Sequence, residues 1–305
     1  MKTPKAAVLT TLNHPFEIKQ YPITPPPKGY AQLKLAASGI CGTDIHIQTG
    51  KLGPAFANKI IGHEFIGQIV AIAPEDAAAS GFSIGDMAMV YIACPCGTCL
   101  LCKTGDDANC VNMTVTSSGD PDTAPHFHGG FAQVSYAPVA NLIKLPAKLD
   151  PVMASVFACP GPTALHAFSL AQKAGVNMAG VSTAVVQGMG PVGAFAVMYL
   201  STLGIKSIIA IGKGRDAGKE ALVKQLGATK ILYVDESSEA DIAGEIMNIS
   251  GGLGVDLVYE ASGSPAAIPL GMNMLRNRGV YLVPGQYSNS GGIEIQPQLI
   301  TFKAL

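Results

Sequence analysis

The sequence has no tryptophan, few charged residues and no long uninterrupted apolar run. Charged residues make up 13% of its 305 residues, the formal net charge is −1, and lysine and arginine are scattered along the chain. A nucleic-acid-binding surface needs a basic stripe, so we expect no nucleic-acid partner. The most apolar stretch, residues 181–211, is interrupted by four glycines, a proline and a lysine. A membrane-spanning helix needs about 20 apolar residues in succession, so we expect no membrane span.

The first residues, MKTPKAAVLTTL, also lack the apolar run and the cleavage-site pattern of a secretory signal peptide. We therefore expect a cytoplasmic protein. In that reducing compartment, the seven cysteines are interpreted as metal ligands or free thiols rather than as disulfide partners.

Four cysteines lie in one short stretch with the spacing C-x2-C-x2-C-x7-C. Four thiolates this close together suit one tetrahedral Zn²⁺ that is closed to solvent and substrate. Such a site holds structure and performs no chemistry, so a catalytic centre is expected elsewhere. Cys94 precedes the stretch but falls outside the spacing. The predicted structural-zinc lobe covers about residues 94–112, with the ligands Cys96, Cys99, Cys102 and Cys110.

The length of the chain and a change in its sequence pattern indicate two domains with a boundary near residue 150. Hydrophobic residues make up 48% of the chain, which is enough for two cores, and 35 glycines supply frequent turns. Residues 1–150 contain short apolar runs separated by glycine and proline, a pattern typical of a β-rich domain. The predicted strands there are Ala31–Ala36, Phe65–Ile72, Met87–Tyr91 and Phe131–Tyr136.

Residues 151–290 instead alternate strands with helices, which predicts βαβ units and a doubly wound parallel sheet. Helices are predicted over Val156–Ala174, near Ala240–Ser250 and over Ala266–Leu275. The expected fold class is therefore α/β and β. The predicted strands of the second domain are Thr183–Gln187, Ser207–Ile211, Ile231–Val234, Asp256–Glu260 and Val280–Val283.

A G-x-G-x-x-G motif follows the first of these strands and opens a helix, which is the context that dinucleotide binding requires. The first glycine permits a tight turn, the second lets the backbone approach a pyrophosphate, and the third allows close packing of helix on strand. A glycine-rich turn without a ligand is the alternative. The motif residues expected at the cofactor are Gly188, Gly190, Pro191, Val192 and Gly193.

The second strand of the parallel sheet bears on the choice of cofactor. An NAD site usually carries an acidic residue about 20 residues beyond the glycines, where it binds the ribose 2′-hydroxyl. Here the strand ends in Gly212-Lys213-Gly214-Arg215, without an acid. Gly212 leaves room for a 2′-phosphate, and Lys213 and Arg215 supply positive charge. The sequence therefore favours NADP over NAD, unless both basic residues are ordinary solvated loop charges.

Three further residues of metal-ligand type, Cys41, His63 and Cys159, are weak evidence when taken singly. A cysteine in an apolar stretch, such as Cys159, is more often a core residue. A lone histidine such as His63 is more often a hydrogen-bonded structural residue. Together with the four-cysteine stretch and the glycine motif, however, the three match a known family.

The chain resembles the zinc-containing medium-chain alcohol dehydrogenase family. The resemblance runs from about Ala6 to the last residue and implies a GroES-like catalytic domain, a Rossmann cofactor domain and a homo-oligomer. It also places Thr163 at the cofactor. The resemblance rests on motifs in family order, namely Gly39–His46, Gly62-His63-Glu64, the four-cysteine lobe, Cys159-x3-Thr163 and Gly188–Gly193.

The resemblance further implies how the metal site is built. Cys41, His63 and Cys159 would bind a catalytic zinc, with water or substrate in the fourth position. Glu64 would lie close behind the metal. Asp44 would orient the His63 imidazole.

The chemistry explains why such residues are needed. Hydride leaves an alcohol carbon readily only when the oxygen becomes alkoxide-like, and an open zinc site lowers the pKa of the hydroxyl. By the same resemblance, Thr43 accepts the released proton and His46 passes it to solvent. A surface imidazole is the alternative for His46.

We therefore predict an oxidoreductase with two zinc ions per chain that transfers hydride between a small alcohol or polyol and NADP or NAD, giving a carbonyl product. The alternative is a catalytically inactive cofactor-binding or scaffold protein. A zinc-free quinone reductase is disfavoured by Cys41 and His63. Compared with the family, the chain stops early. We expect residues 291–305 to begin a truncated closing segment, with residues 300–305 leading into a sixth strand.

Overall fold

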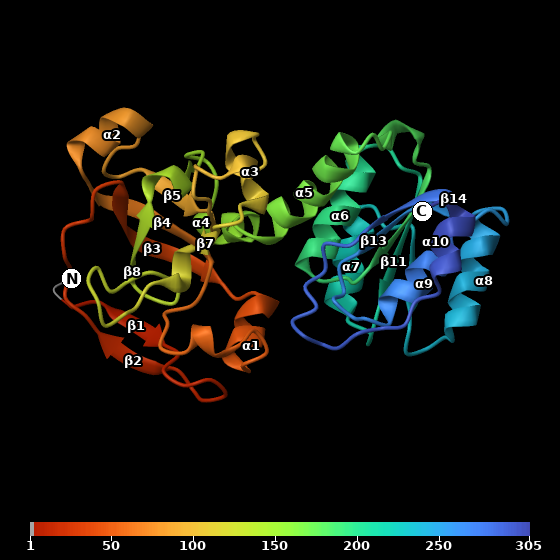
Figure 1. The fold of residues 1–305 in the computed structure, drawn as a ribbon, viewed down its shortest axis with the longest axis horizontal. Helices are drawn as coiled ribbons and strands as arrows, with labels where there is room; N and C mark the ends of the chain where they lie inside the picture. The colour runs from red at the N-terminus through yellow and green to blue at the C-terminus, as the bar shows by residue number, and fades with distance from the viewer. Residues whose placement is uncertain (1–2) are drawn as a thin grey trace. The chain divides into compact units, whose positions relative to one another are not determined.

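The computed structural model describes residues 3–305 and divides the chain into two compact units, Met1–Cys159 and Pro160–Leu305 (Figure 1). The division therefore lies at residue 159, later than the boundary expected near residue 150. Among residues 3–305 the structure contains no helix that could serve as a membrane span.

Within residues 3–159, the largest sheet is antiparallel and has the strand order β8-β3-β4-β5-β9. Its core is formed by alternate side chains of neighbouring strands, such as Leu33, Phe65 and Val90, each 0% exposed. The predicted strand at Phe131–Tyr136 starts three positions later, at Val134. The strands of this sheet are β3 (Tyr30–Gly39), β4 (Glu64–Ile72), β5 (Met87–Val90), β8 (Val134–Pro138) and β9 (Leu142–Lys144).

Smaller elements surround this sheet. Two short antiparallel ladders pair β1 with β2 and β6 with β7. The strands and helices concerned are β1 (Lys5–Val8), β2 (Glu17–Gln20), α1 (Gly42–Gln48), α2 (Pro74–Ser80), β6 (Ala93–Cys94), α3 (Leu100–Lys103), β7 (Thr114–Val115) and α4 (Pro151–Ala154).

Within residues 160–305, the sheet is parallel and has the order β12-β11-β10-β13-β14. The order reverses beside β10, and ligands of such sheets bind at the carboxyl ends of the strands next to that reversal. The fold class predicted from the sequence is confirmed. The strands are β10 (Thr183–Gln187), β11 (Ser207–Gly212), β12 (Lys230–Tyr233), β13 (Val255–Glu260) and β14 (Leu275–Leu282).

Helices cover both faces of the parallel sheet, with α6 and α7 on one side and α8 and α9 on the other (Figure 1). A helix was predicted to begin at Val156, but α5 begins at Pro160, because proline fits the first turn of a helix and disrupts its interior. The helices are α5 (Pro160–Lys173), α6 (Pro191–Thr202), α7 (Ala217–Leu226), α8 (Glu239–Ile249), α9 (Ala267–Met274) and α10 (Pro297–Lys303).

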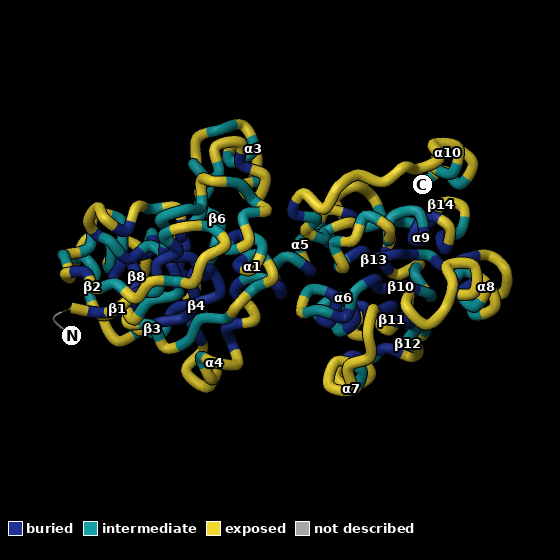
Figure 2. The backbone as a smooth tube through the Cα atoms, turned by 90° about the horizontal axis from the view of Figure 1, so that it is seen from below, coloured by how far each residue is buried: buried dark blue, intermediate teal, exposed yellow. Residues whose placement is uncertain are grey.

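The strands of the parallel sheet are buried on both sides because their alternate side chains serve two cores. Ala184 and Val186 of β10 pack in the core shared with α5 and α6, whereas Val185 packs in the core shared with α8 and α9. Figure 2 shows the same contrast, with β10 and β13 buried and α7 and α8 largely exposed. The apolar run of the first predicted strand is explained by this double burial.

A short helix, α10, lies close to the end of the chain. Most of residues 300–305, predicted as the lead-in to a sixth strand, lie in α10. The Lys303 ammonium group donates hydrogen bonds of 2.8–2.9 Å to the carbonyl groups of Met272, Asn273 and Leu275. These carbonyl groups lie at the C-terminal end of α9, where a cation is stabilising, so Lys303 fixes α10 there.

Asp256 connects three strands at their amino ends. Its Oδ2 accepts hydrogen bonds from the backbone and hydroxyl groups of Ser182 and Thr183, and its Oδ1 accepts from Arg276 Nε at 2.6 Å. Burial alone would raise the pKa of Asp256, but the hydrogen bonds from Arg276, Ser182 and Thr183 outweigh burial and hold this pKa well below its ordinary value.

Asp256→Asn should lower the free energy of unfolding by about 2–3 kcal/mol at pH 7. Every partner of the Asp256 carboxylate is a donor, so the amide group of asparagine would face a donor group. The difference from wild type should be full above about pH 4 and shrink below it, as the wild-type carboxylate becomes protonated. Urea denaturation across pH measures both effects. Glu294→Gln, an exposed acid, is the control; an equal loss in both variants would contradict the prediction.

Candidate functional site

Two clusters of metal-ligand side chains form within residues 3–159. In each cluster, the possible ligand atoms all lie within 4.8 Å of one another. One cluster contains Cys96, Cys99, Cys102 and Cys110, and the other contains Cys41, His63, Glu64 and Cys159.

The four-cysteine cluster has the dimensions of a tetrahedral thiolate site. Its Sγ–Sγ distances include 3.4 Å for Cys99–Cys102, 3.8 Å for Cys99–Cys110 and 4.0 Å for Cys96–Cys102. Zn–S bonds of about 2.3 Å place the sulfur atoms of a tetrahedron roughly 3.7 Å apart, whereas a disulfide needs about 2.05 Å. All four cysteines are free thiols, and the donor set fits zinc.

Backbone groups of the lobe point at the sulfur atoms. The amide of Cys96 donates to Cys110 Sγ at 3.3 Å, and that of Cys99 donates to Cys96 Sγ at 3.4 Å. The Thr98 hydroxyl and the amides of Thr98 and Cys99 lower the pKa of Cys96 to about 5. Cys94 lies outside the cluster, where its sulfur accepts a 3.3 Å hydrogen bond from Asn141 Nδ2.

The second cluster joins three separate segments of the chain. Cys41 immediately precedes α1, His63 immediately precedes β4, and Cys159 is the last residue of the first unit. Gly62 turns the chain before His63 with φ of 92°, a conformation that favours glycine. Gly39 lies against Glu64, and an added Cβ there would collide with the Glu64 carboxylate.

Asp44, which is 3% exposed, ties two of these segments together. Its Oδ2 accepts a 2.8 Å hydrogen bond from the Cys41 amide, and its Oδ1 accepts one of 3.2 Å from the Gly62 amide. The same Oδ1 lies 3.2 Å from His63 Nδ1. This contact fixes the imidazole and leaves Nε2 as the ligand atom.

The electrostatics of the second cluster favour a thiolate at Cys41. A hydrogen bond from Cys159, supported by His63 and the Thr43 amide, lowers the pKa of Cys41 to about 3 despite burial. Burial would lower the pKa of His63, but Asp44 and Cys41 raise it to about 10. Burial and the charge of Cys41 raise the pKa of Glu64 to about 7. A cation at this point would replace the proton that these groups share.

Two further residues predicted at the site, Thr43 and His46, lie on α1 beside Cys41. Both side chains are half-buried. Within the described residues, His46 Nδ1 is buried and has no hydrogen-bond partner. An unpaired buried ring nitrogen next to a metal-ligand cluster can exchange a proton with a ligand or a water molecule.

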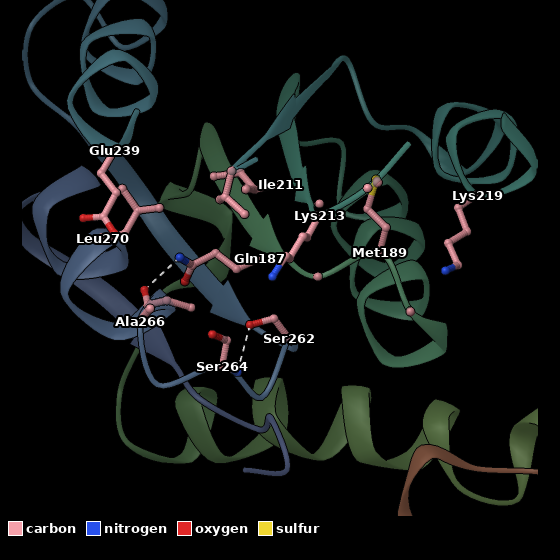
Figure 3. Close-up of a pocket in the computed structure, with 16 residues that line it drawn as sticks. Gln187, Met189, Ile211, Lys213, Lys219, Glu239, Ser262, Ser264, Ala266 and Leu270 are labelled. Carbon is pink, nitrogen blue, oxygen red and sulfur yellow. Dashed lines mark hydrogen bonds between the residues drawn. The ribbon is translucent and has the colours of Figure 1, made fainter. Parts of the chain in front are cut away.

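The second unit contains a cavity of about 280 Å³ at the carboxyl ends of the parallel strands (Figure 3). Residues after β10, β11 and β13 line it, as expected for a sheet of this topology. The sequence-predicted residues that line the cavity are Gly188, Gly190, Gly212 and Lys213; those that the sequence did not single out include Gln187, Lys219, Glu239, Ser262 and Ser264.

The three glycines of the motif are needed for different reasons. Gly188 has φ of 100°, and an added Cβ would lie 2.8 Å from Ser262 N. An added Cβ at Gly190 would meet nothing within 4 Å, so space is open at the N-terminus of α6. At Gly193, an added Cβ would collide with the Gly188 carbonyl oxygen. The open point at the start of a 12-residue helix suits a pyrophosphate.

The residues around the motif differ in how close they come to the cavity. Pro191 is the first residue of α6, where its missing N–H costs no hydrogen bond, and Val192 follows it. Neither lines the cavity, nor does Thr163 of α5.

The basic residues beyond β11 also differ from one another. Lys213 and Lys219 line the cavity; in Figure 3, Lys213 extends toward Gln187 and Lys219 lies beyond Met189. Arg215 does not line it, because its guanidinium group makes two hydrogen bonds of 2.6 and 2.7 Å with Glu236. The Met189 side chain fills the space beside Gly212.

Comparison with known proteins decides the family. The model of the alcohol dehydrogenase GroES-like domain matches residues 27–147, and that of the zinc-binding dehydrogenase matches residues 191–305. L-threonine 3-dehydrogenase from Bacillus velezensis is 34% identical over 86% of this chain and 70% of its own length. The chain belongs to the zinc-containing medium-chain dehydrogenase family.

Solved structures agree with this assignment to the dehydrogenase family. An alcohol dehydrogenase from Thermotoga maritima superimposes with a TM-score of 0.88 at 27% identity, over 99% of this chain and 83% of its own. A zinc-binding dehydrogenase from Sinorhizobium meliloti bound to NADP has a TM-score of 0.83 at 26% identity, over 100% of this chain and 83% of its own. The resemblance predicted from the motifs is confirmed, and the dehydrogenase is an oxidoreductase of alcohols that uses a nicotinamide cofactor.

Gly193→Ala should weaken cofactor binding at least tenfold, since the backbone carbonyl of Gly188 cannot move aside as a flexible side chain could. Titration with NADPH and NADH measures the loss. Gly244→Ala is the matched control, because its Cβ meets nothing within 4 Å and alanine favours the exposed helix α8. Unchanged affinity in Gly193→Ala would show that the turn does not hold the cofactor.

Proposed function

We propose that this dehydrogenase holds two zinc ions per chain and oxidises a small alcohol or polyol with a preference for NADP over NAD. The observation that carries the proposal is the convergence of two complete ligand sets. One set consists of four thiols, and the other of two thiols, an imidazole and a carboxylate. The first suits a closed structural site and the second a site with an exchangeable position. The two ligand sets give no support to a catalytically inactive cofactor-binding protein. Seven cysteines without a disulfide fit a reducing compartment, which supports a cytoplasmic location.

In the second set, Cys41, His63 and Cys159 would hold the catalytic metal, with Glu64 beside them. When bound, zinc supplies a Lewis acid that lowers the pKa of an alcohol hydroxyl group. Burial of His63 and Glu64, which are 2% and 7% exposed, excludes water from this side of the site. Asp44 holds the His63 ring in one orientation. It also fixes the backbone of Cys41, because its carboxylate accepts a hydrogen bond from the Cys41 amide.

The proton released from the alcohol needs acceptors on this chain. Thr43 and His46 lie three residues apart on α1, so their side chains share one face of the helix. The Thr43 hydroxyl can accept the proton and donate its own, and His46 can carry it to solvent. The unpartnered Nδ1 of His46 supports this role.

The cofactor preference rests on the residues beyond β11. The last residue of the strand is Gly212. The charged residues that line the cavity beside it are two lysines, Lys213 and Lys219, and a single acid, Glu239. The nearby carboxylate of Asp235 accepts two 3.0 Å contacts from the Gly214 amide. A 2′-phosphate would therefore meet positive charge from Lys213 and Lys219.

Cys41→Ser should abolish turnover and reduce the zinc content from two ions per chain to one, because serine is a poor zinc ligand and the four-cysteine site is separate. Elemental analysis and a nicotinamide absorbance assay with alcohols and polyols measure both. Cys94→Ser, which changes a thiol outside both clusters, should keep two zinc ions and full activity. A Cys41→Ser protein that retains turnover would remove the catalytic-zinc assignment.

Lys213→Ala should raise the KM for NADP about tenfold and leave the KM for NAD within about twofold, since only the former cofactor carries the 2′-phosphate. Steady-state kinetics with both cofactors provides the comparison. Lys206→Ala, an exposed lysine before β11, should change neither value. Equal effects on the two cofactors would argue against the preference for NADP.

A further inference from the structure

A buried carboxylate at the end of β13, that of Glu260, has no part in the sites described above. Glu260 is 0% exposed and lies beside Gln187 in the sheet register. Its Oε1 accepts hydrogen bonds from the Ser262 amide at 2.6 Å, the Gly263 amide at 3.0 Å and the Ser262 hydroxyl. Its Oε2 accepts a 2.6 Å hydrogen bond from the Tyr287 hydroxyl.

These hydrogen bonds join two loops that lie far apart in the sequence. One loop, residues 261–264, follows β13, and the other, residues 283–288, follows β14. The loops approach so closely that an added Cβ at Gly263 would collide with the Gln286 carbonyl oxygen, and one at Gly285 would collide with Glu260 Oε2. The Gly285 amide also donates to the Glu260 carbonyl oxygen at 3.1 Å.

The first of these loops forms a wall of the cofactor cavity. Ser262 and Ser264 line the cavity and are joined by a hydrogen bond from the Ser264 amide to Ser262 Oγ (Figure 3). The same loop lies against the first glycine of the phosphate-binding turn, since an added Cβ at Gly188 would be 2.8 Å from Ser262 N. The Ala261 amide donates to the Gln187 carbonyl oxygen at 2.7 Å.

We propose that Glu260 is a positioning residue for the phosphate-binding turn and that Tyr287 is its required partner. Glu260 holds the Ser262 and Gly263 amides, the loop in turn holds Gly188, and Gly188 sets where the pyrophosphate meets α6. The Ser262 and Gly263 amides already donate to Glu260, so they are unavailable to the cofactor. Its contribution to affinity is therefore indirect and comes from the shape of the turn. The inference applies to either nicotinamide cofactor.

Tyr287→Phe tests the proposal with the smallest change, because it removes one hydroxyl group and leaves Glu260 Oε2 buried without that donor. The dissociation constants of NADPH and NADH, measured by calorimetry on the full chain, should both rise about three- to tenfold. The kcat at saturating cofactor should stay within about twofold of wild type, since the turn affects binding and not the reacting atoms.

Tyr259→Phe is the matched control. It also removes a tyrosine hydroxyl that donates one hydrogen bond, in this case a buried one of 3.1 Å to the Ala164 carbonyl oxygen in α5 rather than to Glu260. It should lower the melting temperature and leave both dissociation constants within about twofold of wild type. If Tyr259→Phe weakens cofactor binding as much as Tyr287→Phe does, the effect is a general loss of stability and the proposal fails.

Two variants of Glu260 complete the test. Glu260→Ala removes all four hydrogen bonds and should weaken cofactor binding more than tenfold. Glu260→Gln can still accept from the Ser262 and Gly263 amides while its amide group donates to the Tyr287 oxygen, so it should restore binding to within about threefold of wild type. Wild-type affinity in both Tyr287→Phe and Glu260→Ala would overturn the proposal.

Discussion

The hydrogen bonds accepted by Asp44 are the constraint on which the proposed metal site depends. Cys41 and His63 belong to separate segments, and Asp44 binds the Cys41 amide, the Gly62 amide and the His63 ring at once. A buried carboxylate is stable only when donors surround it, so the acid and the two segments stabilise one another. The result is an imidazole held in one tautomer, with Nε2 free to bind the metal.

The second unit also contains a buried carboxylate that holds a loop in place. Glu260 is a buried carboxylate that accepts backbone and side-chain hydrogen bonds and thereby fixes a loop beside a functional turn. In both units the functional group lies on a loop, and the rigidity of that loop comes from an acid at the end of a strand or in the first turn of a helix. Loops positioned by a rigid scaffold carry the functional residues in many folds.

Much of the fold and the four-cysteine cluster could be predicted because local spacing encodes them, whereas the grouping of Cys41, His63 and Cys159 was expected only from the family resemblance. Cys96, Cys99 and Cys102 are close in sequence, and β10 was predicted residue for residue from its apolar run. The cavity wall at Ser262 was missed, because it depends on which strands are neighbours in space. The engagement of Arg215 by Glu236 was missed for the same reason, since the two residues follow different strands. Glu260 gave no signal, because an acid at the end of an apolar strand is equally common on a surface.

The central claim is that two zinc ions lie in two separate ligand sets of the first unit. Anomalous X-ray diffraction from crystals of the protein, recorded on both sides of the zinc absorption edge, tests it most directly. The account predicts two anomalous peaks per chain, one among the sulfur atoms of Cys96, Cys99, Cys102 and Cys110 and one among Cys41, His63 and Cys159. A single peak, or a second peak away from Cys41, His63 and Cys159 in zinc-replete protein, would contradict it.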